Sequence, residues 1–241
     1  MSQNDVMVVI GGNRGIGAAI SRMAATRGWT VLLTYSARAD EAEAIVRDVS
    51  GAGGSACAFR CDVTREDDIA ALFREAAGIG PVRAMVYSSG ITGDASPLAE
   101  VTEDTLRKVV DVNLTGAMLC AREAVRAMGE GGGSITFISS RASDRGSAGE
   151  YVWYAATKGA INSLSLGLSR ELAAQGIRVN CVSPGPVATE MLSAERQAKG
   201  AAAVPMQRVG TPEEIAEAAL FLASDAASYV TGANLAVAGG A

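Results

Sequence analysis

The chain has 241 residues, of which 49% are hydrophobic, enough to bury the core of one large α/β domain or of two small ones. Its net charge is −5 and it contains no basic run, so nucleic acid is not expected as a partner. The absence of histidine excludes catalysis by Ser-His-Asp and Cys-His groups.

Short β-rich runs alternate with helical patterns along the chain. The first apolar run, Val6–Ile10, is typical of a strand buried on both faces, and residues 16–27 follow with apolar side chains at helical spacing. The same patterns predict further strands over 30–35, 56–61, 84–88, 134–139, 177–183 and 234–237. They predict further helices over 40–49, around 69–76, over 103–128 and 155–174, and from a capping box at 211–214 onward.

The repeated order of strand, helix and strand favours an α/β fold, with a parallel sheet and helices on both of its faces. No internal repeat, linker or low-complexity segment divides the sequence. The glycines at 129–133 are interpreted as the end of one helix before the next strand. One domain over residues 1–241 is therefore expected.

A glycine-rich turn, GGNRGIG over residues 11–17, links the first predicted strand to the first predicted helix. Such a turn binds phosphate because free N–H groups and the helix dipole point at the ligand. It lacks the Gly-Lys-Ser/Thr ending of a nucleoside triphosphate loop. An ordinary tight turn is the alternative interpretation.

The end of the second predicted strand bears on the choice between NAD and NADP. An acid there binds the ribose 2′-hydroxyl, whereas a basic environment suits a 2′-phosphate. No acid occupies the expected place, while Ser36 can donate a hydrogen bond and Arg14 and Arg38 can reach a phosphate. This pattern favours NADP(H), and the alternative is that both arginines are merely solvated.

Tyr154 and Lys158 lie four residues apart, on one face of a predicted helix. With 5 tyrosines, three lysines and no histidine in the chain, few other groups could transfer a proton near neutral pH. A lysine ammonium favours the tyrosinate, so Lys158 is expected to lower the pKa of Tyr154 from its usual value of about 10. A surface Tyr–Lys pair is the alternative.

With these motifs the sequence resembles the short-chain dehydrogenase/reductase family over nearly its whole length. The spacing of Gly11, Gly15 and Gly17 matches the family's cofactor motif, with Ile10 where threonine is usual. The resemblance implies a single-domain Rossmann fold, a doubly wound parallel sheet of about seven strands flanked by helices. It also implies hydride transfer between a nicotinamide and a carbonyl or secondary alcohol.

Four residues match the family's catalytic set, namely Asn113, Ser140, Tyr154 and Lys158. The resemblance implies that Tyr154 exchanges a proton with the substrate oxygen, that Ser140 hydrogen-bonds this oxygen, and that Lys158 holds the nicotinamide ribose. Asn113 is implied to hold a water that links Lys158 to solvent. Ser140 lies one residue further from Tyr154 than is usual, and Ser139 is the less favoured alternative.

The residues implied to contact NADP(H) lie mostly after the ends of predicted strands. Asp62 and Val63 resemble the family's adenine-contacting pair, and residues 183–189 resemble the loop that holds the nicotinamide carboxamide. At 87–90 the sequence reads YSSG where the family has NNAG. The full set is Gly11, Asn13, Arg14, Gly15, Ile16, Gly17, Ser36, Arg38, Asp62, Val63, Ser88, Gly90, Tyr154, Lys158, Pro184, Gly185, Val187 and Thr189.

Residues 189–210 resemble the family's mobile substrate lid, and an ordinary surface helix and loop is the alternative. This segment contains Met191 and Leu192. Tyr151 and Trp153 lie close to the predicted active-site tyrosine in sequence. These side chains suggest a small, partly apolar carbonyl or alcohol substrate.

No metal site is expected, because the four cysteines include no Cys-x-x-Cys pair and histidine is absent. Buried free thiols suit a reducing compartment. No apolar stretch reaches about 18 residues and the N-terminus has no signal-peptide pattern. We therefore expect a cytoplasmic protein without membrane contact. The resemblance implies a homotetramer paired through the long helices, with a dimer as the alternative.

The leading prediction is an NADP(H)-dependent reductase resembling the 3-oxoacyl-(acyl-carrier-protein) reductases. A sugar or polyol dehydrogenase of the same family is an alternative with the same chemistry. A non-catalytic dinucleotide sensor on the same fold is an alternative of a different class. A sensor would be expected to have a broken catalytic set, whereas all four catalytic positions are present here.

Overall fold

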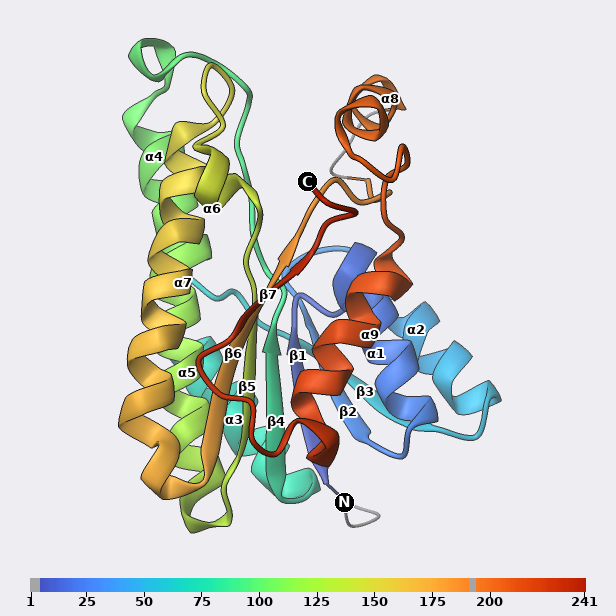
Figure 1. Cartoon of the computed structure of the whole chain (residues 1–241). Helices are drawn as coiled ribbons and strands as arrows, with labels where there is room; N and C mark the ends of the chain where they lie inside the picture. Colours follow the sequence, from blue (N-terminus) through green and yellow to red (C-terminus); the bar gives the residue numbers. More distant parts are fainter. Residues whose placement is uncertain (1–4, 191–193) are drawn as a thin grey trace.

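The computed structural model describes residues 5–190 and 194–241, which form a three-layer α/β fold (Figure 1). Its centre is a seven-stranded sheet in the order β3-β2-β1-β4-β5-β6-β7, in which every neighbouring pair is parallel. The predicted single-domain Rossmann fold is confirmed. The strands are β1 (Val6–Ile10), β2 (Thr30–Tyr35), β3 (Ser55–Arg60), β4 (Val82–Tyr87), β5 (Gly133–Ile138), β6 (Ile177–Pro184) and β7 (Asn234–Val237).

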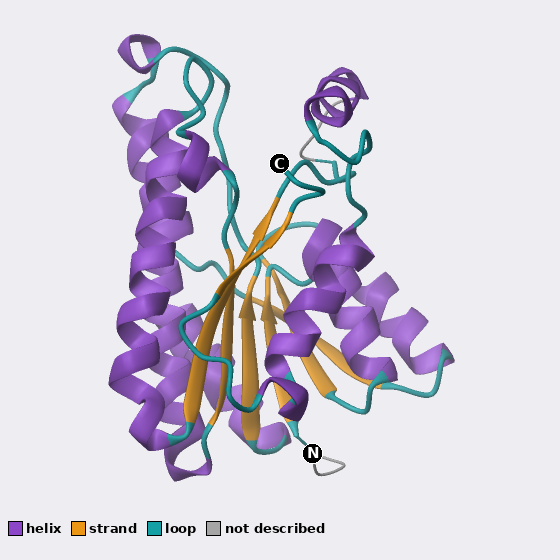
Figure 2. Cartoon of the chain, in the orientation of Figure 1, coloured by secondary structure: helices purple, strands orange, loops and turns teal. Residues whose placement is uncertain are grey.

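Helices cover both faces of this sheet (Figure 2). Helices α3, α5 and α7 pack on one face, and α1, α2 and α9 pack on the other. The helices and their bounds are α1 (Gly15–Thr26), α2 (Ala39–Gly51), α3 (Glu66–Ile79), α4 (Glu103–Val110), α5 (Gly116–Met128), α6 (Ala142–Arg145), α7 (Val152–Leu172), α8 (Ala194–Ala203) and α9 (Pro212–Ala223). Short 3-10 turns in the described part of the chain are η1 (Leu98–Glu100), η3 (Gly129–Gly131), η4 (Ala173–Gln175) and η5 (Asp225–Ala227).

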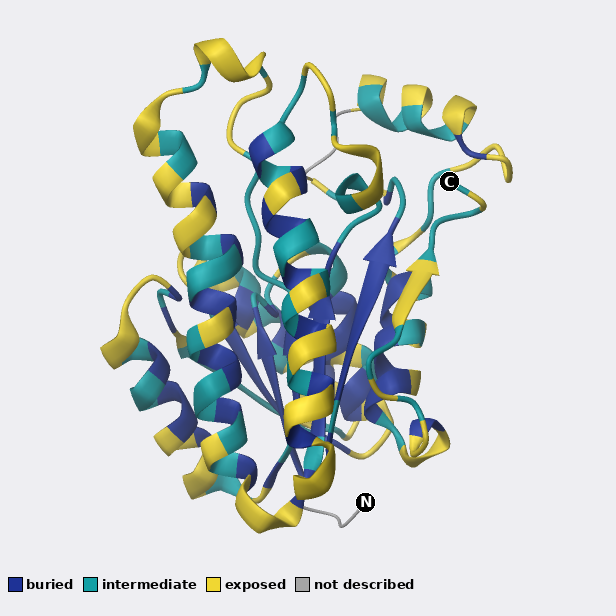
Figure 3. Ribbon diagram, turned by 60° about the vertical axis from the view of Figure 1, so that its left-hand side comes forward, coloured by how far each residue is buried: buried dark blue, intermediate teal, exposed yellow. Residues whose placement is uncertain are grey.

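Strand β1 shows why the core has two halves. Val6, Val8 and Ile10 belong to the apolar cluster under α3, α5 and α7. Met7 and Val9 belong to the cluster under α1, α2 and α9. Successive side chains of a strand point to opposite faces, so a continuous apolar run contributes side chains to the apolar clusters on both faces of the sheet. Figure 3 shows the result, with buried strands between helices whose outer sides are exposed.

The predicted helix over 103–128 is interrupted in the structure. Residues Asp111–Thr115 form a π-helical turn, η2, between α4 and α5. A π turn inserts an extra residue into the helical hydrogen-bond pattern and shifts the side chains that follow. Here it carries Asn113, which is completely buried. Hydrophobic periodicity cannot show such an insertion, because the apolar face continues on both sides of it.

The other differences from the sequence prediction are small. Helix α7 begins at Val152 rather than at 155, and the short helices α6 and α8 were not predicted because neither has a clear apolar stripe. The capping box is confirmed, with Thr211 accepting from the Glu214 backbone and the Glu214 side chain accepting from Thr211. Within the described residues, no helix has the length and apolar character needed to cross a membrane.

The cysteines are free thiols, as expected from the sequence. Cys61, Cys120 and Cys181 are buried, and Cys57 is half-buried. Burial raises the pKa of Cys61 to about 12 and that of Cys181 to about 11. These thiols therefore stay protonated at neutral pH and pack as small apolar groups.

Candidate active site

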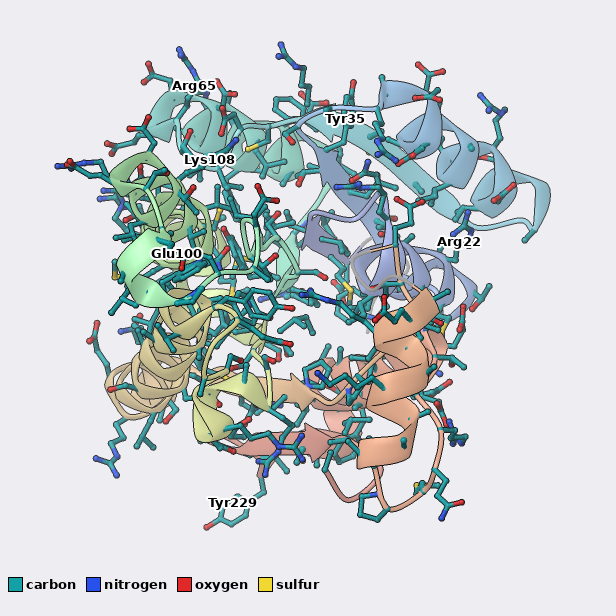
Figure 4. All side chains as sticks on the ribbon, turned by 90° about the horizontal axis from the view of Figure 1, so that it is seen from above. Arg22, Tyr35, Arg65, Glu100, Lys108 and Tyr229 are labelled. Carbon is teal, nitrogen blue, oxygen red and sulfur yellow. The ribbon has the colours of Figure 1, made fainter. Side chains whose placement is uncertain are left out.

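The carboxyl ends of the parallel strands meet at one edge of the sheet, which Figure 4 shows from above. A cleft of about 1470 Å³ opens at this edge. Strand order reverses between β1 and β4, and α/β sheets bind ligands at such a point. All of the residues predicted for catalysis or cofactor binding line the cleft, except Gly17 and Asn113.

The glycine-rich turn is held against the end of β2. The Gly11 N–H donates to Thr34 Oγ1 at 2.9 Å, and the Gly12 N–H donates to the Thr34 carbonyl at 2.9 Å. Gly11 has φ +71°, and a Cβ at this position would lie 2.6 Å from Ser89 Oγ. This turn delivers the N-terminus of α1, without a side-chain cap, to the cleft. Exposed N–H groups at such a terminus suit a phosphate.

Gly17 does not line the cleft and instead has a role in packing. It is buried in α1, and a Cβ on it would lie 2.1 Å from the Gly11 carbonyl oxygen. The sequence prediction named Gly17 as a cofactor contact, but the structure places it behind the turn. Its lack of a side chain lets α1 approach the turn closely.

Four charged side chains meet beside the end of β2, and three of them line the cleft. Arg38 Nη1 lies 2.8 Å from Glu41 Oε1 and 3.3 Å from Glu190 Oε2. Arg14 Nη1 lies 3.6 Å from Glu190 Oε2, and Arg14 Nε lies 3.9 Å from Glu41 Oε2. The bond and charge of Glu41, with a smaller contribution from Glu190, raise the pKa of Arg38.

Sequence reasoning identified both arginines but missed both carboxylates. Glu41 could have been found, because it stands three residues after Arg38 at the start of a predicted helix. Glu190 could not, because it comes from a loop 152 positions away. Ser36 and Asn13 line the same end of the cleft. Arg38 adopts φ +58°, unusual for a residue other than glycine, as it leads into α2.

Asp62 and Val63 line the cleft after β3. Asp62 Oδ1 accepts from the Thr64 N–H at 3.0 Å and from the Thr64 hydroxyl at 2.8 Å. These hydrogen bonds lower the pKa of Asp62, so it is an anion at neutral pH. Asp62 does not cap α3, because Arg65 occupies the N-cap position of that helix.

The loop after β4 is braced by two residues. Asn113 Oδ1 accepts from the Ile91 N–H at 2.9 Å, and its amide donates to the Ile91 carbonyl at 2.9 Å and to Thr157 Oγ1 at 3.1 Å. The buried Tyr87 hydroxyl donates to the Val112 carbonyl at 2.5 Å. Together these bonds tie η2 to the loop. They hold the segment in which YSSG replaces the family's NNAG.

The two adjacent serines after β5 point in different directions. Ser139 is buried and donates to Asn162 Oδ1 at 2.6 Å, and lies 3.2 Å from the Lys158 carbonyl. Ser140 lines the cleft together with Tyr154, and its Oγ accepts from the Ala142 N–H at 3.0 Å. The geometry therefore favours Ser140 over Ser139 as the serine that faces a substrate.

Tyr154 and Lys158 share one face of α7 at the floor of the cleft. Lys158 Nζ lies 5.6 Å from the Tyr154 ring centroid and donates to the Ile138 carbonyl at 2.8 Å. Burial lowers the pKa of Lys158 to about 8. Burial also raises the pKa of Tyr154, against a smaller lowering by its bond to Ser140.

The direction of the Tyr154 shift differs from the sequence-based expectation. The expected lowering assumed a lysine ammonium acting on a solvated phenol. In this structure Lys158 is buried and Tyr154 is half-buried, and desolvation disfavours the charged form of each. Tyr154 is therefore a protonated phenol at neutral pH, ready to donate.

The end of β6 and the loop that follows it form part of the cleft wall. Pro184, Gly185, Val187 and Thr189 all line the cleft. Val187 pairs with Gly210 in an isolated parallel bridge. A Cβ on Gly185 would lie 3.0 Å from Ala238, so this backbone packs closely against the chain after β7.

Helix α8 reaches the cleft through Arg196. Its guanidinium lies over the Tyr151 ring, 5.2 Å from the centroid, and donates to the Tyr151 hydroxyl. Tyr151 in turn meets Tyr154 edge-on, with ring centroids 6.2 Å apart. Trp153, by contrast, is buried and donates to the Thr92 carbonyl at 2.7 Å.

Two predicted substrate contacts, Met191 and Leu192, lie outside the described residues. No group of three or more His, Cys, Asp or Glu side chains that could hold a metal ion occurs in the described part of the chain. The chemistry of the described cleft is thus that of hydroxyls, an amine, guanidinium groups and carboxylates.

A family model described as Enoyl-(Acyl carrier protein) reductase matches residues 10–241. The chain belongs to the short-chain dehydrogenase/reductase family. It is therefore an oxidoreductase, as the sequence predicted. The hydroxyl pair of Ser140 and Tyr154 beside Lys158 is in keeping with this membership.

Relatives in the short-chain dehydrogenase/reductase family match nearly the whole chain. The uncharacterized oxidoreductase YgfF of Escherichia coli is 42% identical, over 98% of this chain and 99% of its own. The cis-4-hydroxycyclohexanecarboxylate dehydrogenase of Sinomonas cyclohexanicum is 42% identical, over 98% and 95%. The 3-oxoacyl-(acyl-carrier-protein) reductase FabG of Chlamydia muridarum is 38% identical, over 98% and 97%.

Solved structures of the family superpose closely on this one. A short-chain dehydrogenase/reductase from Serratia marcescens has a TM-score of 0.94 at 36% identity and covers 99% of this chain and 98% of its own. A blue fluorescent protein from a metagenomic library, solved in complex with NADPH, has a TM-score of 0.92 at 35% identity, over 98% and 97%. The fold and the oxidoreductase class are thereby established, while cofactor preference and substrate remain predictions.

Proposed function

We propose that the protein is an NADP(H)-dependent oxidoreductase that interconverts a carbonyl group and a secondary alcohol, with a 3-oxoacyl thioester as the leading substrate class. The observation that carries the proposal is that Ser140, Tyr154 and Lys158 line the same cleft, with the Lys158 amine 5.6 Å from the centroid of the Tyr154 ring. The uncapped N-terminus of α1 lies at this cleft too.

The described residues suit NADP(H). The glycine turn and the start of α1 would take the pyrophosphate, and Asp62 and Val63 would contact the adenine end. Arg14 and Arg38 would take the 2′-phosphate, while the loop over 184–189 would face the nicotinamide. The bound nicotinamide supplies or accepts the hydride.

Tyr154 acts as the general acid in reduction and donates its phenolic proton to the carbonyl oxygen. In oxidation it accepts the proton of the alcohol. Its raised pKa keeps it protonated at neutral pH, which suits the reductive direction. Ser140 donates a hydrogen bond to the same oxygen as negative charge develops there.

Lys158 stabilises the phenolate that remains after Tyr154 has given up its proton. A cation about 5 Å from a ring interacts favourably with it, and more strongly with its anion. Lys158 is also positioned to hold the nicotinamide ribose hydroxyls. Asn113 acts as a positioning residue, because its three hydrogen bonds hold the loop that follows β4. A water held near Asn113 that links Lys158 to solvent remains part of this proposal.

A second candidate substrate class is a hydroxy acid and its oxo acid. Four basic side chains line the cleft around α6 and α8, namely Arg141, Arg145, Arg196 and Lys199. Arg141 pairs with Asp144, and Glu150 is a carboxylate in the same lining. The Sinomonas relative is named for a hydroxycarboxylate. A carboxylate would be attracted to this basic end. A sugar or polyol remains an alternative with the same chemistry.

The same proposal includes a substrate lid, an oligomeric assembly and a location in the cell. Residues 189–210 are proposed as a substrate lid, supported by the contact of Arg196 with Tyr151. A homotetramer or dimer paired through the long helices is proposed for the assembly, and the cytoplasm for the location.

Cofactor titration followed by a substrate screen tests the proposal. Tryptophan fluorescence from Trp29 and Trp153 would be followed during titration with NADPH and with NADH. We expect NADPH to bind more tightly, and a 3-oxoacyl thioester to be reduced faster than oxo acids or ketoses. Tighter NADH binding would overturn the NADP assignment, and binding of neither would overturn the oxidoreductase mechanism.

A further inference from the structure

The two arginines that would bind a 2′-phosphate are already paired with carboxylates. Arg38 lies 3.3 Å from Glu190 and 2.8 Å from Glu41, and Arg14 lies 3.6 Å from Glu190. The two positive charges of these guanidinium groups are balanced by the two negative charges of the Glu41 and Glu190 carboxylates. A phosphate that approaches this cluster therefore meets no net positive charge until a carboxylate leaves.

The two carboxylates differ in how they are anchored. Glu41 lies in the first turn of α2, where the helix dipole favours an acid, and its side chain is 29% exposed. Glu190 follows Thr189 in the loop after β6 and has a side chain that is 67% exposed. Glu190 is therefore the carboxylate that can leave at small cost.

We infer that Glu190 is a specificity-determining residue that competes with the cofactor's 2′-phosphate for Arg14 and Arg38. The inference rests on the proposed use of NADP(H). A ligand with a 2′-phosphate must displace the Glu190 carboxylate from both guanidinium groups. A ligand with a free 2′-hydroxyl leaves the Glu190 ion pairs in place. Glu190 thus reduces the preference for NADP(H) that the two arginines would otherwise confer.

The exchange is favourable for electrostatic reasons. A phosphate monoester carries about −1.5 to −2 charges at neutral pH and offers three acceptor oxygens, against one charge on Glu190. Arginine binds such groups through two parallel N–H donors. Arg14 is 51% exposed and Arg38 is 52% exposed, so both can turn toward a phosphate.

The experiment compares wild-type protein with the Glu190→Gln variant in equilibrium titrations that need no turnover. Two ligand pairs differ by the 2′-phosphate, namely NADPH with NADH and adenosine 2′,5′-bisphosphate with adenosine 5′-monophosphate. Glu190→Gln is expected to tighten binding of both 2′-phosphate ligands by about three- to tenfold, as for the loss of one or two exposed ion pairs. Binding of NADH and adenosine monophosphate should change by less than about twofold.

Two control variants isolate the mechanism. Glu195→Gln removes the same charge from the exposed start of α8. Among the described ion pairs, none joins Glu195 to Arg14 or Arg38, so this variant should leave the affinities for all four ligands unchanged. In an Arg14→Ala/Arg38→Ala background, Glu190→Gln should no longer tighten binding. A thermal scan of each variant confirms that it is folded.

Failure of this inference can be told apart from failure of the proposed function. If wild-type protein binds NADPH no more tightly than NADH, and the double arginine variant is unchanged, the NADP assignment is wrong. If NADPH is preferred but Glu190→Gln leaves the 2′-phosphate ligands unaffected, the competition is absent. Equal tightening of all four ligands, or weaker NADH binding, would also overturn the role given to Glu190.

Discussion

Ser139 donates a 2.6 Å hydrogen bond to the Asn162 side chain within the protein, whereas its neighbour Ser140 lines the cleft together with Tyr154. Two adjacent serines thus have separate tasks. Ser139 ties the end of β5 to α7, and Ser140 faces the cleft. Alanine variants of the two should therefore fail in different ways.

We expect Ser140→Ala to lower kcat by about 10²-fold with an unchanged melting temperature, because it removes a donor to the developing oxyanion. Ser139→Ala should instead lower the free energy of unfolding by about 1–3 kcal/mol, because it leaves the half-buried amide oxygen of Asn162 without its donor. Steady-state kinetics and urea unfolding of both variants check this. The opposite pattern would show that Ser139 is the serine that acts on substrate.

Tyr154→Phe should lower turnover by about 10²-fold or more, because it removes the proton that neutralises the substrate oxygen. NADPH binding should stay within about twofold, since the hydroxyl is not a phosphate contact. Tyr229→Phe is the matched control, because Tyr229 is fully exposed and points away from the molecule (Figure 4). Turnover of Tyr154→Phe at the wild-type rate would contradict the proposed mechanism.

Lys158 should make stability depend on pH. Its folded pKa of about 8 lies below the usual 10.5, so the unfolded chain binds more protons between these values. The cost of the buried charge is fully present below pH 8 and disappears as pH rises toward the unfolded pKa. Between pH 7.5 and 9.5, wild-type stability should rise relative to Lys158→Met by about 2 kcal/mol. Urea unfolding of both proteins across this range measures the difference, and a constant difference would contradict it.

Asn113→Ala should lower the free energy of unfolding by about 2–4 kcal/mol, because it leaves both backbone groups of Ile91 without their partner. Gln175→Ala, which truncates an exposed amide in η4, should change stability by less than about 0.5 kcal/mol. Chemical unfolding gives both values. A neutral Asn113→Ala would mean that the loop after β4 is held by other contacts.

Gly17→Ala should damage both folding and cofactor binding, because its Cβ would lie 2.1 Å from the Gly11 carbonyl oxygen. We expect a loss of more than about 2 kcal/mol in stability and at least about tenfold in NADPH affinity. Gly78→Ala is the control, since a Cβ there meets nothing within 4 Å, and it should be neutral or stabilising by up to about 1 kcal/mol. Calorimetry measures the stability of both variants, and cofactor titration measures their affinity for NADPH. Equal stability and affinity of the two variants would rule out the packing role of Gly17.

The sequence alone determined the order of strands and helices, because apolar periodicity and turn residues are local signals. It also located the glycine turn at 11–17 and the pair of Tyr154 and Lys158, since each motif lies within one loop or one helix. The resemblance of these motifs predicted the family that the comparisons then showed.

Only the tertiary structure decided matters that depend on residues far apart in the chain. It showed that Glu190 lies 3.3 Å from Arg38 although 152 positions separate them. It also showed that burial raises the pKa of Tyr154 where sequence spacing had predicted a lowering. Spacing along a helix tells which side chains are neighbours. The charge state of those neighbours depends on how much water the rest of the fold excludes, and no local pattern records that exclusion.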